Sequence, residues 1–268
     1  MSKLKNKVAI ITGSSMGIGK VMAQQMLDQG AKVVLNARNE KRLQNTYDFF
    51  KSKNYPVIAV AGDVSKIEDC QRLTEKTITA FGQIDILINN AGISMEGEVN
   101  DVAPEVFRKV MEVNYLGSVF PTKAALPHLK TSNGSVIFIS SAAGIRGLPR
   151  YAVYSSSKMA LTALAESMKI ELYGSNVHIG IAYVGFTKND EQKTIYDSNG
   201  KIIAQPVRTF IKAEPPENVS HRIIRMIEKR RFKEVFTPLG KLNAVVNRWA
   251  PGLGELILRK NYIKNWKS

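Results

Sequence analysis

Short apolar runs alternate along the chain with stretches whose apolar residues recur every three to four positions. The runs predict strands, and the periodic stretches predict helices. The predicted strands are Val8–Ile11, Lys32–Leu35, Val57–Ala61, Ile84–Ile88, Ser135–Ile139, Val177–Ala182 and Glu234–Thr237. Strands joined by helical crossovers are typical of a parallel sheet covered on both faces, so we expect a doubly wound α/β domain of about seven strands.

The predicted helices fill the intervals between these strands. They are Ile18–Asp28, Asn39–Lys53, Lys66–Phe81, a helix that contains Asn114, a long helix from about Tyr154, and Pro216–Arg231. Residues 186–268 are less regular, with a polar stretch at Thr187–Gln205 and an apolar, basic tail over residues 240–268. We interpret these parts as an insertion and a tail on a single domain that spans residues 1–268.

Composition narrows the class of protein. With 268 residues, 44% of them hydrophobic, the chain can bury one substantial core. The single cysteine, Cys70, excludes an intrachain disulfide and favours an intracellular, cytoplasmic protein. The three histidines lack the spacing of metal ligands, so we expect no metal site. Because no run of 18 apolar residues occurs, we also expect a soluble protein without a membrane-spanning helix.

The charge of the chain is strongly positive and unevenly distributed. The formal net charge is +15, and from Arg222 to Ser268 there are twelve Lys and Arg residues against three Glu. Such an excess is typical of proteins that meet nucleic acid, anionic lipid or an acidic partner. Signatures of nucleic-acid-binding modules are absent, so we expect no nucleic acid partner. A basic surface that keeps the protein soluble and contact with an anionic surface or ligand stay open as interpretations.

A glycine-rich turn joins the first predicted strand to the first predicted helix. It reads Thr12-Gly13-Ser14-Ser15-Met16-Gly17-Ile18-Gly19. Glycine lets backbone N–H groups approach a pyrophosphate closely, and the helix N-terminus presents partial positive charge to it. The turn therefore predicts a dinucleotide site of the Rossmann type. The candidate contacts within the turn are Gly13, Ser15, Gly17, Ile18 and Gly19.

Four further motifs follow the turn. They are Asn89-Asn90-Ala91-Gly92, Val113-Asn114-Tyr115, Ser140-Ser141-Ala142-Ala143-Gly144 and Tyr154-Ser155-Ser156-Ser157-Lys158. Together with the turn, their order and spacing resemble those of the short-chain dehydrogenase/reductase family, in its single-domain, classical-size branch that prefers NADP. The resemblance covers about residues 6–190. It implies a Rossmann-type doubly wound sheet and a nicotinamide cofactor.

The resemblance implies a catalytic set of Asn114, Ser141, Tyr154 and Lys158. In it Tyr154 transfers the proton, Ser141 hydrogen-bonds the substrate oxygen, Lys158 also holds the nicotinamide ribose, and Asn114 anchors a water relay. Tyr154 and Lys158 stand four residues apart at a helix start and share a face. Because a neighbouring ammonium favours the phenolate, we expect the pKa of Tyr154 to lie below its ordinary value. A solvated helix face is the plain alternative for such a pair.

Two neighbours share residue types with this set. Ser140 precedes Ser141, and adjacent strand residues point to opposite sides, so only one hydroxyl is expected to reach the site. The spacing to Tyr154 favours Ser141. Tyr151 is the other decoy, because the residue four positions after it, Ser155, carries no charge.

The end of the second strand bears on the choice of nicotinamide. Ala37 stands where NAD-preferring relatives carry an acidic residue, and Arg38 follows it. Because a guanidinium can fork onto a 2′-phosphate, we expect NADP(H) as the cofactor. A surface arginine at a helix start is the alternative. Met16 stands where many NADP-binding relatives have a basic residue.

The resemblance adds cofactor contacts outside the turn. Asp63 and Val64 resemble the pair that contacts adenine, and Asn90 belongs to the N-N-A-G motif. Asp63 is also a candidate helix N-cap, although Ser65 is the better candidate for that role.

After the sixth strand the chain departs from the family pattern. Gly185 is kept, but Val184 replaces the usual proline, and either Thr187 or Asn189 is expected to contact the carboxamide. Residues 188–212 fall where relatives carry a substrate-covering loop.

The tail and the long helix suggest two kinds of contact. The tail places Trp249 among apolar and basic residues, as in an amphipathic helix on a membrane surface. Packing on its own domain or sealing a dimer are the alternatives. Relatives usually assemble through the helix that bears Tyr154, so we expect a homodimer or homotetramer.

The sequence thus predicts an NADP(H)-dependent oxidoreductase. It would transfer hydride between nicotinamide and a carbonyl or secondary alcohol of a hydrophobic, acyl-, sterol- or polyketide-like small molecule. One alternative is an NADP-linked dehydrogenase of a polar sugar or polyol. A non-catalytic dinucleotide-binding sensor or scaffold is the alternative from another class, and the intact catalytic set argues against it.

Overall fold

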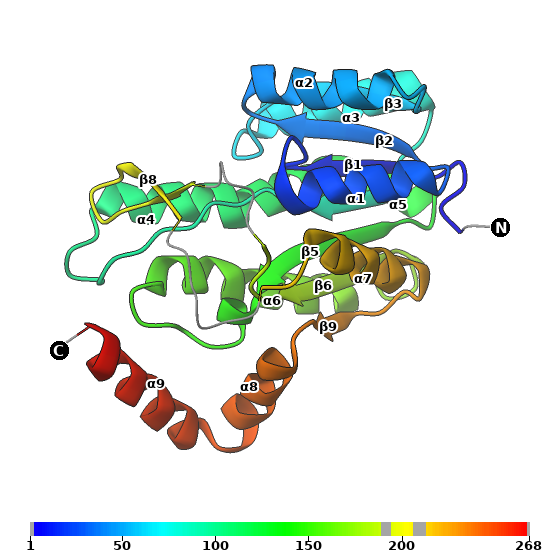
Figure 1. The fold of residues 1–268 in the computed structure, drawn as a ribbon. Coiled ribbons are helices and arrows are strands. Elements are labelled where there is room, and N and C mark those ends of the chain that lie inside the picture. Colours follow the sequence, from blue (N-terminus) through cyan, green and yellow to red (C-terminus); the bar gives the residue numbers. More distant parts are fainter. Residues whose placement is uncertain (1–2, 189–193, 206–212, 267–268) are drawn as a thin grey trace.

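Seven parallel strands form the central sheet of this computed structural model, which describes residues 3–188, 194–205 and 213–266. The strand order is β3-β2-β1-β4-β5-β6-β9 (Figure 1). The strands are β1 (Val8–Thr12), β2 (Lys32–Ala37), β3 (Val57–Ala61), β4 (Ile86–Asn89), β5 (Ser135–Ser141), β6 (His178–Val184) and β9 (Lys233–Val235). The predicted doubly wound parallel sheet is confirmed.

Helices cover both faces of the sheet and bury it. They are α1 (Gly17–Asp28), α2 (Glu40–Lys51), α3 (Ile67–Phe81), α4 (Pro104–Met111), α5 (Gly117–Thr131), α6 (Ala152–Glu171) and α7 (Pro216–Glu228). One apolar cluster joins α1, α2 and α7 to one face, and a second joins α3, α5 and α6 to the other. Strands that are covered on both sides need apolar residues on both sides, which is why they appear in the sequence as unbroken apolar runs.

The strand order reverses between β1 and β4, which pair with each other at the centre of the sheet. The connections after these two strands lead to opposite sides, so a crevice opens at their carboxyl ends, where ligands of such sheets bind. The predicted strand bounds hold to within about two residues. β5 and β6 each run two residues further than predicted, and this extension places Ser141 at the end of β5.

A hairpin occupies part of the stretch predicted to be irregular. β7 (Thr194–Tyr196) pairs antiparallel with β8 (Ile202–Ala204). In the turn between them, Asp197 Oδ1 accepts hydrogen bonds from the N–H groups of Asn199 and Lys201, at 2.9 and 2.8 Å, and Gly200 has φ of +79°. An Asp followed closely by Asn-Gly is a local turn signal, although this stretch was predicted to be irregular. The rest of the predicted substrate loop, including Asn189, lies largely outside the described residues.

The tail forms two helices, α8 (Pro238–Trp249) and α9 (Pro251–Trp266), which we call the C-terminal arm. Figure 1 shows them as a V that extends away from the sheet. Within the three described ranges, no helix has the length and apolar character needed to cross a membrane.

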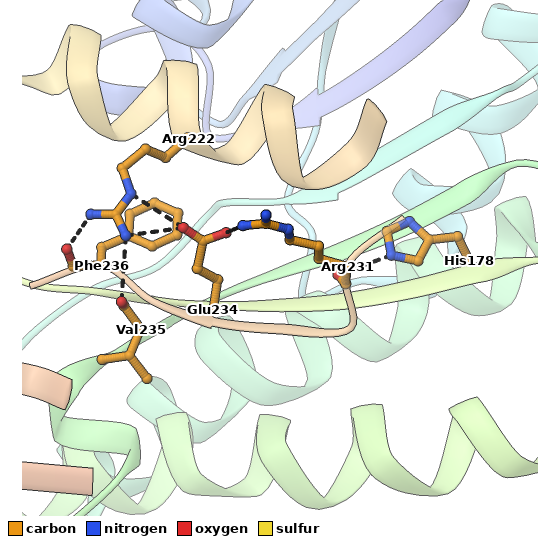
Figure 2. Close-up of polar contacts among 6 residues, drawn as sticks. All are labelled: His178, Arg222, Arg231, Glu234, Val235 and Phe236. Carbon is orange, nitrogen blue, oxygen red and sulfur yellow. Dashed lines mark hydrogen bonds and ion pairs between the residues drawn. The ribbon is translucent and has the colours of Figure 1, made fainter. Parts of the chain in front are cut away.

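A polar network secures the edge strand β9 (Figure 2). Arg222 of α7 binds Glu234 at 3.0 Å and donates to the carbonyl of Phe236, while Arg231 binds the other oxygen of Glu234 at 3.3 Å. His178, at the start of β6, donates from Nε2 to the carbonyl of Arg231 at 3.0 Å. Burial lowers the pKa of His178 to about 4, so the imidazole is neutral at pH 7.

The neutral His178 makes stability depend on pH. Its pKa is about 4 in the folded state and near 6.5 in the unfolded chain, so between these values the unfolded state binds more protons. The free energy of unfolding should therefore fall as the pH drops from 6.5 to 4, by about 3 kcal/mol from this group. Urea unfolding across this window should show a shallower fall for His178→Gln than for the wild type. Parallel profiles would contradict the assignment.

Candidate functional site

Three elements bring the predicted catalytic side chains to the carboxyl edge of the sheet. Ser141 ends β5, Tyr154 and Lys158 lie in the first turns of α6, and Asn114 lies in a π-helical turn, Glu112–Leu116, between α4 and α5. The hydroxyls of Ser141 and Tyr154 are hydrogen-bonded. The Nζ atom of Lys158 lies 5.9 Å from the centroid of the Tyr154 ring.

The π-helical turn directs Asn114 inward. Its Nδ2 donates to the carbonyl of Ile93 and to Ser157 Oγ, both at 2.9 Å, and its Oδ1 accepts from the N–H of Ile93 at 2.8 Å. A β-carbon on Gly92 would lie 3.2 Å from Asn114 Oδ1 and 3.3 Å from Lys158 Nζ. The amide and the ammonium thus border the same point, and a residue larger than glycine would crowd both. Widened turns of this kind recur at functional sites.

The ammonium of Lys158 is buried and hydrogen-bonded. The residue is only 5% exposed, and Nζ donates to the carbonyl of Ile139 at 2.9 Å. The buried Ser140 hydroxyl donates to the backbone carbonyl of Lys158 at 3.0 Å. Ser140 therefore holds α6 against β5, while Ser141 meets Tyr154. The other decoy, Tyr151, donates to Glu96 at 2.8 Å.

The expectation of a lowered pKa for Tyr154 is wrong. Burial raises the pKa of this phenol above its ordinary value, and the hydrogen bond with Ser141 offsets the rise only in part. The reason is physical: a phenolate here would lose its hydration, while the nearest ammonium already binds the carbonyl of Ile139. The phenol is protonated at neutral pH.

The N-N-A-G motif is hydrogen-bonded to the glycine-rich turn. Asn90 Nδ2 donates to the carbonyls of Thr12 and Gly13 at 2.9 and 3.0 Å. Gly13 has φ of +63°, and a β-carbon there would lie 2.8 Å from the Cα of Ala91. The side chain of Asn90, predicted to contact the cofactor, is therefore bonded to the turn and shapes it.

The N-terminus of α1 is suited to an anion. Met16 precedes the helix without a side-chain cap, and the first turn holds no acidic residue. A β-carbon on Gly17 would meet nothing within 4 Å, so the turn faces open space here. Ser15 and Gly19 are buried, and Ile18 packs on the core. Uncapped N–H groups at a helix N-terminus bind phosphate readily, so these residues fit a dinucleotide pyrophosphate.

A pocket of about 240 Å³ lies at the carboxyl ends of β2 and β3. Its lining residues are Arg38, Glu40, Ala61, Gly62, Asp63, Asp69 and Arg72. Arg38 is 43% exposed and lies 3.7 Å from Asp63. Although burial acts to raise it, hydrogen bonds from Ser65 and the charge of Arg38 hold the pKa of Asp63 below its ordinary value. The carboxylate is thus ionised and faces the predicted adenosine end.

Neither Asp63 nor Ser65, the two candidate N-caps, occupies the N-cap position of α3. The N-cap position is Lys66, which makes no side-chain capping bond. Asp63 Oδ1 instead accepts from the N–H and hydroxyl of Ser65, at 3.0 and 2.7 Å, and closes a local turn. Val64 is buried against Gly117, so its backbone is the part of this residue left to meet a ligand.

Sequence reasoning missed Arg42. This residue lies in the first turn of α2, where its N–H binds the capping Oδ1 of Asn39 at 2.8 Å. Its Nη1 lies 3.0 Å from the sulfur of Met16. The guanidinium of Arg42 therefore lies next to Met16, the position at which many NADP-binding relatives have a basic residue. No helical spacing could have revealed it, because Arg38 lies before the start of α2 and the contact of Arg42 with Met16 depends on how α2 packs.

The segment after β6 is tightly constrained. A β-carbon on Gly185 would collide with Thr237, and Thr187 forms a β-bridge with Glu214. Of the two candidate carboxamide contacts, Thr187 is described and Asn189 is not. No cluster of three or more His, Cys, Asp or Glu suited to a metal occurs in the described ranges.

The comparison with protein families now decides the family. A model of the short chain dehydrogenases matches residues 7–200. The chain belongs to the short-chain dehydrogenase/reductase family. This family comprises oxidoreductases that act on CH–OH donors.

Relatives and solved structures agree with this assignment. The 11-beta-hydroxysteroid dehydrogenase 1A of Arabidopsis thaliana is 40% identical over 217 residues, which are 79% of this chain and 61% of that protein. The chain thus spans less than two thirds of that relative's length.

Two solved structures share the fold. A short chain dehydrogenase/reductase from Burkholderia phymatum in complex with NAD has a TM-score of 0.82 at 24% identity, covering 95% of this chain and 97% of that one. An alcohol dehydrogenase from Thermococcus sibiricus complexed with 5-hydroxy-NADP has a TM-score of 0.75 at 25% identity, covering 87% and 96%. Both hold a nicotinamide dinucleotide, one of each type.

Asn90 offers a test of how the turn is held. Asn90→Ala leaves the carbonyls of Thr12 and Gly13 without their donor, which should lower the free energy of unfolding by about 1–3 kcal/mol. Asn90→Asp keeps the shape but removes the donor, so it should destabilise at least as much. Urea unfolding measures both, and two neutral substitutions would contradict this role.

Proposed function

We propose that this protein is an NADP(H)-dependent oxidoreductase that transfers hydride between nicotinamide and a carbonyl or secondary alcohol of a hydrophobic substrate. The observation that carries the proposal is the meeting of Ser141, Tyr154 and Lys158 beside Asn114, at the sheet edge that also carries the glycine-rich turn.

Each catalytic side chain has a distinct task. A bound nicotinamide supplies the hydride chemistry. Tyr154, protonated at neutral pH, donates its proton to the substrate oxygen as that oxygen gains negative charge. Ser141 hydrogen-bonds the same oxygen. The buried charge of Lys158 then stabilises the phenolate that remains, and Asn114 fixes the surrounding backbone through Ile93 and Ser157. A phenol that is protonated at neutral pH is in the form that can donate this proton.

Two arginines support a preference for NADP(H). Arg38 follows Ala37 at the end of β2, and Ala37 stands at the position where NAD-preferring relatives carry an acidic residue. Its ion pair with Asp63 is long, at 3.7 Å, so the guanidinium can turn to a 2′-phosphate. Arg42 adds a second positive charge next to Met16. In this proposal the two guanidiniums bind the phosphate from either side.

The hydrophobic substrate class is supported by the relative from Arabidopsis, whose name is that of a hydroxysteroid dehydrogenase. An assembly through α6 is supported by Ile170 near the end of that helix, which is 72% exposed. The single cysteine, Cys70, is buried, which is compatible with a cytoplasmic location.

Tyr154→Phe should lower kcat/KM by about 100-fold to 10,000-fold, because it removes the proton donor and keeps the ring. The dissociation constant of NADPH should hardly change. The measurement is NADPH oxidation against carbonyls graded by chain length and polarity, with sugars included. Tyr151→Phe is the matched control, since that hydroxyl binds Glu96 instead. Full activity in Tyr154→Phe would remove the assigned proton donor, and turnover of sugars alone would support a polar substrate.

Arg38→Asp should raise the dissociation constant of NADPH about 10-fold to 100-fold, the range expected when a charge-assisted hydrogen bond is lost, and leave that of NADH nearly unchanged. Arg42→Gln should act in the same direction. Lys41→Gln removes an exposed positive charge next to Arg42 and serves as the control. Fluorescence titration with both nucleotides measures these constants. Equal shifts for NADPH and NADH would show that neither arginine binds the 2′-phosphate.

A further inference from the structure

The C-terminal arm turns polar side chains toward the domain. Asn247 of α8 donates to the carbonyl of Ile145 and accepts from Arg146, both at 3.0 Å. Tyr262 of α9 donates to Glu98 at 2.6 Å. Soluble amphipathic helices normally meet their own domain with an apolar stripe. At these contacts the arm instead meets the domain with polar side chains.

The apolar side chains of the arm point outward. Eight large ones are between 49% and 77% exposed, and Trp249, at the end of α8 where the V bends, is the most exposed. They are Leu239, Leu242, Val245 and Trp249 on α8, and Leu253, Leu256, Ile257 and Ile263 on α9. On α8 they recur every three to four residues and form one stripe, and on α9 they lie on the side of the helix that also carries Lys260. Such a stripe is larger than the scattered apolar residues of an ordinary surface, which marks it as a contact surface.

The described part of the domain does not cover this stripe. A hollow of about 550 Å³ lies between α9 and the segment from Arg146 to Met159. The arm residues that face the hollow are Glu255, Leu258, Arg259 and Tyr262, on the side of α9 opposite to the apolar stripe. α9 therefore lies over a cavity on its inner side, where Leu258 faces the cavity, while Leu253, Leu256, Ile257 and Ile263 are exposed on the other side of the helix.

Basic residues share the outward face. Lys260 follows Leu256 and Ile257 by four and three residues, so it lies in the same stripe of α9 and is exposed. Lys241 and Arg248 flank the stripe of α8 and are exposed too. From residue 238 to the end of the chain there are six Lys and Arg residues against one acidic residue, Glu255. Leucines and a tryptophan interleaved with basic residues are typical of helices that lie in the headgroup region of a membrane.

A second copy of the chain fits this face less well. In a two-fold symmetric contact the same patch meets itself, so the basic residues of one arm would approach those of the other. The one acidic side chain of the arm, Glu255, faces the hollow and not the stripe. Anionic lipid presents negative headgroups next to apolar acyl chains, which matches the basic residues and the apolar side chains of the arm. We propose that the C-terminal arm docks on an anionic lipid surface, with Trp249 and the leucines among the acyl chains and the basic residues on the lipid phosphates.

Vesicle binding by the full chain tests the proposal. The probes are vesicles of phosphatidylcholine alone and of phosphatidylcholine mixed with phosphatidylglycerol. The wild type should pellet with the mixed vesicles and far less with the neutral ones. Lys260→Ala should lower the partition coefficient about fivefold at low salt, the contribution expected of one basic residue near an anionic surface. The double variant Leu242→Ser, Leu256→Ser should lower it at least tenfold, because two apolar side chains lose their burial.

Matched controls separate the arm from general surface effects. Tyr173→Ser removes a large side chain that is 92% exposed outside the arm and should leave vesicle binding unchanged. Trp266→Phe leaves Trp249 as the single tryptophan, whose emission should shift to shorter wavelength with mixed vesicles only. This second readout does not depend on the leucine variants or on enzymatic activity. Far-UV circular dichroism checks that each variant folds.

Three results would overturn the proposal. The first is a wild type that does not pellet with the mixed vesicles. The second is an unshifted Trp249 emission in their presence. In the third, the leucine variants keep their vesicle binding but dissociate the protein in sedimentation velocity without lipid, which would identify the arm as a contact between subunits.

Discussion

The buried ammonium of Lys158 is the interaction on which the geometry of the site depends. A charge that is removed from water must be hydrogen-bonded, and Lys158 meets this need through the carbonyl of Ile139 on β5. A second residue of β5, Ser140, donates a hydrogen bond from its hydroxyl to the backbone carbonyl of Lys158. These two bonds fix α6 against β5, and the positions of Ser141 on the strand and Tyr154 on the helix follow from that register.

The residues of the family motifs divide into two groups that spacing alone does not distinguish. Asn90 and Ser140 bond only to the scaffold, and Gly92 leaves room for Asn114 and Lys158. Ser141 and Tyr154 bond to each other at the sheet edge. A change in the first group would disturb function by moving the second group, which is why both kinds of residue stand in the same motifs.

The sheet, and the meeting of Ser141, Tyr154 and Lys158 at its edge, could be predicted because their signals are local: unbroken apolar runs for strands, and fixed spacing for the side chains. What the sequence did not reveal depends on distant parts of the chain. The pKa of Tyr154 is set by burial among elements far away in sequence, and the lysine beside it is already bonded to Ile139. Arg42 gains its place only because α2 packs next to the glycine-rich turn. The hairpin at Asp197–Gly200 is the exception, since its turn signal was local and was overlooked.

The arm is connected to α6, the helix that carries Tyr154, through a chain of polar contacts. Tyr262 binds Glu98, and Arg150 lies 3.9 Å from Glu98 and 3.2 Å from Glu96. Glu96 also accepts the hydroxyl of Tyr151, the residue that precedes α6. Arg150 has φ of +63°, so these contacts hold its backbone in a conformation that non-glycine residues rarely adopt. An arm that rests on a lipid surface would therefore be joined to the first turn of the helix that carries Tyr154. A hydrophobic substrate concentrates in lipid, so an arm that docks on lipid would place the helix that carries Tyr154 close to the substrate's local pool.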